Sequence, residues 1–285
     1  MENRMADDPL FAVKCVEKDI LRQLLRVCQE NNLRIFADGG TLLGAVREKH
    51  FISYDDDIDM AMLREDYDRL MQIGKDCFSE PYFFQSAYTD DGYFRPHIQI
   101  RRSDTCGALD FELGYVRFNQ GIFVDVFPLD GVPDGKIAGR LQWAQICFYK
   151  KLMNLLYSPV PSENAVKRIV KKVFSPLGRV IKREKLYSRF EKICRRYSAS
   201  SETVTLLSFN AKYRMRLLNR RWYDNTVYLP FDEMEVPCPE KYEEVLVSKF
   251  GDWKTPREGT LHGDIIFDTQ KSYLEIKEKT GCKNV

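Results

Sequence analysis

The stretch 54-YDDDIDM-60 alternates acidic and apolar side chains over its last four residues. Successive side chains of an extended chain point to opposite faces, so Asp57 and Asp59 share one face while Ile58 and Met60 point into a core. Their Cα atoms would lie roughly 6.5–7 Å apart, and two carboxylates at that span can converge on one hard cation such as Mg²⁺. A solvated acidic loop is the alternative, but such a loop has no reason to alternate its acids with apolar residues. The pattern therefore predicts a strand that carries metal-binding carboxylates.

Just upstream, the segment 36-FADGGTLLGAVR-47 places two glycines before a helical turn. Gly39 and Gly40 would let backbone N–H groups approach a phosphate, and Thr41 is a suitable cap for the turn. Arg47, one turn further, could add a bidentate contact to the phosphate. A pair of glycines alone usually marks a plain turn. Its position next to the acidic strand makes a phosphate-binding turn the prediction.

A third carboxylate is expected because phosphoryl transfer relies on positioning and on charge neutralisation by metal ions. Asp125 is the candidate, since it lies inside the apolar segment 121-GIFVDVFPLD-130. A buried carboxylate without a partner would be costly, and a salt-bridged structural aspartate is the alternative interpretation. Asp130 precedes a glycine, so we interpret it as a turn-forming residue.

The hydrophobic periodicity along the chain predicts a mixed sheet with helices packed on it, which is an α/β (α+β) fold. Loops are expected around Gly107 and Gly114. The expected helices are 13–30, 42–47, 63–74 and 240–250, the last one closed by Gly251, and the expected strands are 33–37, 52–62, 82–88, 94–102 and 121–127.

The segment 136–200 has a different character from the rest of the chain. It contains 16 Lys and Arg, three Glu and no Asp, a net charge of +13, although the whole chain carries only +2. Its apolar and basic residues alternate with a helical period. We therefore predict three parts: a catalytic core over 1–135, a basic helical insertion over 136–200, and a segment over 201–285 that completes the active site.

Arg95, His97, Gln99 and Arg101 alternate along one predicted strand. We interpret them as a solvated strand face, with a polar wall of the substrate cleft as the alternative. Asp252 follows the glycine that ends the predicted helix 240–250, and it suits a turn as well as a ligand contact.

The cysteines and the N-terminal segment constrain the cellular setting. The eight cysteines form no C-x-x-C pair and only three histidines accompany them, so we expect reduced, packed thiols and no zinc site. The first eleven residues contain no apolar region typical of a signal peptide, and no uncharged run approaches the ~20 residues that span a bilayer. We expect a cytoplasmic protein, at most peripheral on the inner face of the membrane.

Three of these segments together resemble the LicD family, which includes phosphocholine transferases of bacterial surface glycans and the fukutin-related proteins. They are 38-DGGTLLGAVR-47, 55-DDDID-59 and 124-VDVFPLD-130, and the resemblance returns in 249-KFGDWKTP-256 and at His262. Ser53-Tyr54 stands where family members often have Pro-Trp. The fold of the family is similar to that of polymerase-beta-like nucleotidyltransferases, so the resemblance implies such a core.

The resemblance also implies a reaction. A CDP-activated donor such as CDP-choline or a CDP-alditol would pass its phospho-linked group to a hydroxyl of a surface glycan, which can be lipid-linked, and CMP would leave. Mg²⁺ (or Mn²⁺) would be held by Asp57, Asp59 and Asp125, one of which would orient or deprotonate the hydroxyl. The donor would be bound by Gly39, Gly40, Thr41, Arg47, Tyr54 and His262.

Other functions remain open from the residues alone. The same carboxylates would serve an NTP-dependent nucleotidyltransferase that acts on a small acceptor and releases pyrophosphate. A non-catalytic scaffold that binds glycan or lipid has no need to keep the carboxylates. Nucleic-acid binding is not favoured because the basic segment shows no aromatic stacking motif. The basic helices could instead lie on anionic lipid, attract an anionic glycan, or present a solvated face.

Overall fold

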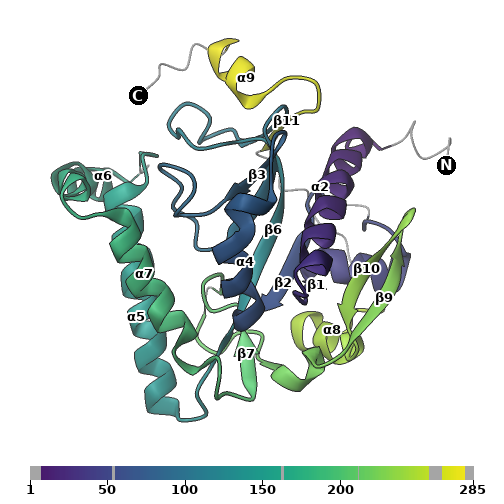
Figure 1. Cartoon of the computed structure of the whole chain (residues 1–285). Coiled ribbons are helices and arrows are strands. Elements are labelled where there is room, and N and C mark those ends of the chain that lie inside the picture. The colour runs from purple at the N-terminus through teal and green to yellow at the C-terminus, as the bar shows by residue number, and fades with distance from the viewer. Residues whose placement is uncertain (1–7, 53–54, 162–163, 211, 257–264, 280–285) are drawn as a thin grey trace.

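The computed structural model describes residues 8–52, 55–161, 164–210, 212–256 and 265–279. Helices and strands alternate in the first half, three helices form an arm at one side, and short strands with two further helices follow the arm (Figure 1). The helices are α2 (Phe11–Glu30), α3 (Gly39–Leu43), α4 (Arg64–Cys77), α5 (Lys136–Tyr157), α6 (Ala165–Phe174), α7 (Arg183–Cys194), α8 (Tyr242–Phe250) and α9 (Tyr273–Lys279), with a π-helical turn η1 (Gly44–Glu48) and 3-10 turns η2 (Ser175–Arg179), η3 (Arg195–Tyr197) and η4 (Arg220–Tyr223).

The centre of the molecule is a mixed sheet. Within the described residues it has seven strands, in the order β1 (Phe36–Ala37), β2 (Asp59–Leu63), β6 (Ile122–Gly131), β4 (Ile98–Arg102) and β3 (Tyr82–Gln85), with β7 (Thr203–Thr205) joining β6 to β8 (Leu218–Asn219). Strands β2 and β6 run parallel, and the other pairs are antiparallel. Two smaller antiparallel pairs lie beside this sheet: β9 (Thr226–Phe231) with β10 (Met234–Pro239), and β5 (Cys106–Leu109) with β11 (Ile265–Asp268).

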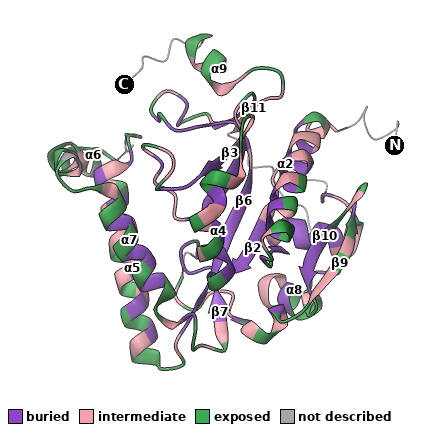
Figure 2. Ribbon diagram, viewed as in Figure 1, coloured by how far each residue is buried: buried purple, intermediate pink, exposed green. Residues whose placement is uncertain are grey.

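Helices α2 and α4 pack against the sheet, as their apolar faces predicted. Ile20 and Leu24 of α2 and Tyr67 of α4 are completely buried, and they join the same core as Met60 of β2 and Val124 of β6. Figure 2 shows these central strands almost entirely as buried residues. The mixed sheet with packed helices is therefore confirmed, whereas the finer assignment to a polymerase-beta-like core stays a prediction.

The basic segment forms a helical arm with a small core of its own. Helices α5 and α7 pack together through Ile146, Met153, Tyr187 and Phe190. The helices begin at Lys136, where the composition changes, and β7 returns to the edge of β6 soon after α7. The division of the chain into three functional parts stays a prediction.

Three local predictions, for residues 55–58, Gly107 and Asp130, were wrong. Residues 55–58 are not part of strand β2, which begins only at Asp59, and the loop expected around Gly107 is strand β5. Asp130 does not form a turn: it is completely buried in β6, where its Oδ1 accepts a 2.6 Å hydrogen bond from Arg64 Nε. The glycine that follows Asp130 does not mark a turn, because β6 continues through Gly131 to pair with β7.

No helix in the described parts of the chain is long and apolar enough to cross a membrane. The cysteines of the same residues are all free thiols, as expected, and Cys282 lies outside them.

Candidate active site

Asp59 and Asp125 lie directly opposite each other on adjacent parallel strands. Asp59 is the first residue of β2, and its Cα partner on β6 is Asp125. Neighbouring strands are about 4.8 Å apart, so the two carboxylates start from backbones at that spacing. The N–H of Asp125 also donates a 3.0 Å hydrogen bond to the carbonyl of Ile58. Two acids separated by more than sixty residues in the sequence are thus adjacent in the fold.

Further acids surround this pair. Burial and then the negative charges of Asp57, Asp125, Asp38 and Asp55 raise the pKa of Asp59 well above its usual range. Such a concentration of like charges is unfavourable unless a cation or proton compensates it. Asp57 precedes strand β2, so the shared strand face predicted for Asp57 and Asp59 does not exist as such, although the two charges do interact.

Glu17 is a member of this acidic cluster that the sequence analysis missed. It lies on α2, is 2% exposed, and its Oε2 is buried with no hydrogen-bond partner among the described residues. Burial raises its pKa well above the usual range, and the charges of Asp57, Asp56 and Asp55 raise it further. The signal was in the sequence, because Glu17 sits four residues after Val13 and three before Ile20, on the apolar face of the helix.

The glycine turn packs against the acids. Gly39 has a φ of +52°, which favours glycine, and a Cβ there would lie 2.8 Å from Asp59 Oδ2. A Cβ on Gly40 would overlap the carboxylate of Asp55. The two glycines therefore let carboxylates approach the start of α3, and the binding of donor phosphates at this turn stays a prediction.

Helix α3 begins at Gly39 with Asp38 as its N-cap residue, so the expected start near Leu42 with Thr41 as the cap was wrong. The Thr41 hydroxyl instead accepts a 2.9 Å hydrogen bond from the N–H of Asp59. It thereby fixes the first residue of β2 against the turn.

Arg47 lies in η1 and points toward the C-terminal part of the chain. Its Nε donates to Glu48 Oε1 at 2.7 Å, and its Nη1 donates to the carbonyl of Trp253 at 3.1 Å. A contact between Arg47 and a donor phosphate stays a prediction. Tyr54 and His262, the other two predicted donor-binding residues, lie outside the described residues.

A buried polar network orients Asp125 from the neighbouring strand β4. Gln99 Nε2 donates to Asp125 Oδ1 at 2.6 Å, and His97 Nε2 contacts the same oxygen at 3.1 Å. Arg101 Nη2 donates to Gln99 Oε1 at 2.7 Å, which fixes the amide so that its NH₂ group faces Asp125. Burial opposes ionisation of Asp125, but the charge of His97 and the hydrogen bonds from His97 and Gln99 outweigh it and lower the pKa.

The interpretation of these alternating residues as a solvated strand face was therefore wrong. His97, Gln99 and Arg101 are all buried, and they connect to the acidic site rather than to water. Arg95 is partly buried and donates a 2.7 Å hydrogen bond to Glu112. A polar strand face can be buried when a buried carboxylate, here Asp125, accepts its hydrogen bonds.

A buried ion pair connects the site to helix α8. Lys249 of α8 donates to Asp38, and both side chains are almost completely buried. Sequence reasoning had included Lys249 only as part of a motif, without a role. Asp252 accepts hydrogen bonds from the backbone and hydroxyl of Thr255, as a turn former does.

Within the described residues, no three His, Cys, Asp or Glu side chains are already arranged to hold a metal ion. The predicted ligands Asp57, Asp59 and Asp125 are brought into one acidic cluster by the fold, and metal binding by them stays a prediction.

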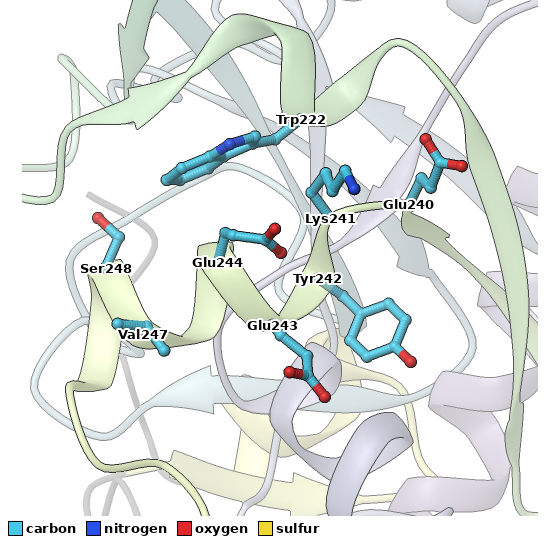
Figure 3. A pocket seen from close by; sticks show the side chains of 8 residues that line it. All are labelled: Trp222, Glu240, Lys241, Tyr242, Glu243, Glu244, Val247 and Ser248. Carbon is cyan, nitrogen blue, oxygen red and sulfur yellow. The ribbon is translucent and has the colours of Figure 1, made fainter.

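A pocket of about 570 Å³ lies elsewhere, on the outer side of α8 (Figure 3). Trp222 and Tyr242 are among its lining residues, together with Glu243 and Glu244. In Figure 3 the Tyr242 ring points away from the Trp222 indole, so the two rings do not enclose one point. None of the predicted site residues line this pocket.

Residues 32–132, which contain the glycine turn and the three aspartates, match the family model described as LicD/FKTN/FKRP, nucleotidyltransferase domain. The chain contains a LicD-family domain. It is 30% identical over 122 residues to the lipopolysaccharide cholinephosphotransferase LicD of Haemophilus influenzae, which covers 41% of this chain and 42% of that protein. An uncharacterised protein of Rickettsia prowazekii is 30% identical over 115 residues, 40% of this chain and 39% of the relative.

An uncharacterised protein of Rickettsia typhi is 35% identical over 54 residues, 19% of this chain and 18% of the relative. The chain thus spans less than half the length of each of these curated relatives. The LicD-family domain includes β2, β6 and the strand β4 that supports them, so the acidic cluster lies inside the matched region except for Glu17. Lys249, which pairs with Asp38, also lies outside the matched region.

Proposed function

We propose that this protein transfers a phospho-linked group, phosphocholine or a phospho-alditol, from a CDP-activated donor to a hydroxyl of a surface glycan and releases CMP. The observation that carries the proposal is the direct pairing of Asp59 with Asp125 beside the glycine turn, within a LicD-family domain. The similarity to a lipopolysaccharide cholinephosphotransferase supports the choice of donor group and acceptor class.

The residues of the site fit a divalent metal ion. Carboxylate oxygens are the ligands that Mg²⁺ prefers. Burial and the neighbouring negative charges raise the pKa of Asp59, so a bound cation would stabilise its charged form. Asp57, Asp59 and Asp125 would hold Mg²⁺ or Mn²⁺. When bound, the cation would neutralise charge on the donor phosphates.

The protein groups then have distinct tasks. The turn at Gly39 and Gly40 would hold the donor phosphates near the carboxylates. The acceptor oxygen would form a bond to the phosphorus that carries the transferred group, and the bond from that phosphorus to the bridging oxygen would break. Its electron pair would leave with CMP, and the proton of the acceptor hydroxyl would pass to a carboxylate.

The network around Asp125 supports a role as an oriented, charged carboxylate. The hydrogen bonds from His97 and Gln99 orient the Asp125 carboxylate and favour its charged form. We therefore assign Asp125 to orienting the acceptor hydroxyl and holding the cation.

A product assay tests the proposal. The full chain is incubated with Mg²⁺, a lipopolysaccharide acceptor and, one at a time, CDP-choline, CDP-ribitol, CDP-glycerol and the four NTPs, and CMP and pyrophosphate are measured. CMP release from one CDP donor, abolished by EDTA and in Asp59→Asn, is the expected result. Pyrophosphate from an NTP would replace the proposal with nucleotidyl transfer, and equal CMP release by Asp59→Asn would refute the role of the acidic site.

A further inference from the structure

Helix α6 presents its apolar side chains to solvent. Val166, Ile169, Val170, Val173 and Phe174 follow one another at helical spacing, and each is exposed, with 39–69% of its surface accessible. The stripe continues through Leu177, Val180 and Ile181, of which Val180 is 81% exposed. Figure 2 shows this end of the arm largely as exposed residues.

Only one described side chain of α6, that of Lys171, is partly buried. Its ammonium donates to the carbonyl of Val160 in the preceding loop. Burial lowers the pKa of Lys171. On a helical projection Lys171 lies roughly opposite the stripe of Val166, Ile169 and Val173. The apolar stripe of α6 is thus exposed, whereas a helix that packs on a globular core buries its apolar stripe.

The charge of this segment restricts what can cover the stripe. Residues 165–182 contain six Lys and Arg and no Asp or Glu, and the described side chains of Arg168, Lys172 and Lys182 are exposed. A second copy of the chain would bring the same positive charge to the contact, so self-association through this face is disfavoured. An anionic lipid surface supplies both an apolar layer for the stripe and negative charge for the bases.

We propose that the segment 165–182, which comprises α6 and η2, binds peripherally to anionic lipid bilayers. The apolar stripe enters the boundary between headgroups and acyl chains while the flanking Lys and Arg contact the headgroups. The proposal is independent of the reaction assigned to the acidic site, because α6 lies at the end of the arm formed with α5 and away from β2 and β6 (Figure 1).

Co-sedimentation of the full chain with vesicles tests this inference. Vesicles of phosphatidylcholine alone are compared with vesicles that contain phosphatidylglycerol at one-third of the lipid, at low and at high salt. We expect binding to the anionic vesicles that weakens with salt, and little binding to phosphatidylcholine. Equal binding to both kinds of vesicle, or no binding to the anionic ones, would overturn the proposal.

Two sets of variants separate the contribution of the apolar side chains to vesicle binding from that of the positive charges. The triple change V166S, I169S and V173S should abolish vesicle binding, because three apolar side chains no longer enter the bilayer. The triple change R168Q, K172Q and K182Q should weaken binding by about fivefold per charge, roughly 100-fold in all. All six side chains are exposed, and unchanged circular dichroism and thermal unfolding would confirm that both variants fold.

Control variants carry changes of the same kinds elsewhere on the surface. V247S with L274S removes exposed apolar groups, and R26Q with R221Q and K241Q removes exposed charges. Both should bind vesicles as the unchanged protein does. Equal loss in the controls would overturn the proposal. It would also be overturned if sedimentation velocity without lipid showed a dimer that only the α6 serine variant lost, because a second copy would then occupy the face.

Discussion

Asp59 and Asp125 are Cα partners across the parallel strands β2 and β6. Thr41 forms a hydrogen bond with Asp59, and Gln99 forms one with Asp125. The pair is therefore fixed from both sides, by a hydroxyl that accepts the N–H of Asp59 and by an amide that donates to the carboxylate of Asp125. Phosphoryl transfer is catalysed mainly by groups that are already positioned to bind metal ions and stabilise charge, and a fixed pair of carboxylates meets this requirement.

Asp59→Asn and Asp125→Asn should each lower donor turnover by about 100-fold or more, because each removes a charged oxygen from the site. Asp252→Asn, an exposed turn residue, should leave turnover unchanged. Steady-state CMP release provides the measurement. If either site variant kept more than half of the activity, the assignment of that carboxylate would be wrong.

Gln99→Leu should lower kcat by about 10- to 100-fold, since Asp125 loses its shortest hydrogen bond and its orientation. The pH profile should shift as well: with the hydrogen bond gone, the pKa of Asp125 rises and activity falls at a higher pH on acidification. Arg101 keeps its hydrogen bonds to Gln85 and Gly121, but its buried Nη2 loses its acceptor, which should cost about 1–3 kcal/mol of stability.

Gln29→Leu, an exposed change on α2, serves as the control for Gln99→Leu. A loss of stability with an unchanged pH profile would show that Gln99 only supports the fold.

Glu17→Gln should stabilise the metal-free protein at neutral pH. Its carboxyl has a pKa raised above the ordinary value near 4.5, so its ionisation opposes folding. Stability from this group is fully present below that ordinary value and is lost as the pH rises toward the raised pKa. The midpoint of thermal unfolding in EDTA, measured from pH 5 to pH 8, should therefore fall less steeply in the variant. Glu30→Gln, exposed on the same helix, should follow the unchanged protein. If Glu17→Gln followed it too, ionisation of Glu17 would not oppose folding and the prediction would be wrong.

Gly40→Ala should destabilise the protein by about 1–3 kcal/mol and reduce turnover, because the added methyl group overlaps the carboxylate of Asp55. Gly135→Ala is the matched control, since its new methyl group would meet only Ala138 Cβ at 3.9 Å. Urea unfolding measures both. An equal loss of stability in the two variants would contradict the inference that Gly40 is needed for the close approach of the Asp55 carboxylate.

Lys249→Met should cost about 3–5 kcal/mol, because it leaves the buried carboxylate of Asp38 without its cation. Lys271→Met breaks the exposed pair with Asp268 and should cost about 1 kcal/mol or less. The midpoint of thermal unfolding measures the loss of stability in each variant. A small effect of Lys249→Met would contradict a stabilising role of the buried Lys249–Asp38 pair.

The sequence predicted most elements and the acids at the centre of the site because periodicity and local spacing carry that information. The helix from Phe11, the helix at Arg64 and the apolar strand around Asp125 are local patterns. What the sequence did not reveal depends on contacts between distant segments. The local sequence predicts a turn at Asp130, and only the fold brings Arg64 against its carboxylate. The alternation along the strand predicts a solvated Gln99, and only the pairing of β4 with β6 places it beside Asp125.

Glu17 is an intermediate case. Its position on the apolar face of α2 was visible in the sequence, but the reason for a charge there appears only when residues 55–57 pack beside the helix. Tyr54 and His262 lie outside the described residues, so their predicted contacts with the donor stay predictions.

Calorimetric titration of Mn²⁺ into the metal-free protein tests metal binding by the acidic pair, because it needs neither the donor nor the acceptor. We expect one saturable site in the unchanged protein, and affinity reduced by at least about 10-fold in both Asp59→Asn and Asp125→Asn, with Asp252→Asn unaffected. Absence of saturable binding, or equal affinity in all four proteins, would contradict the claim that the Asp59–Asp125 pair is a metal centre.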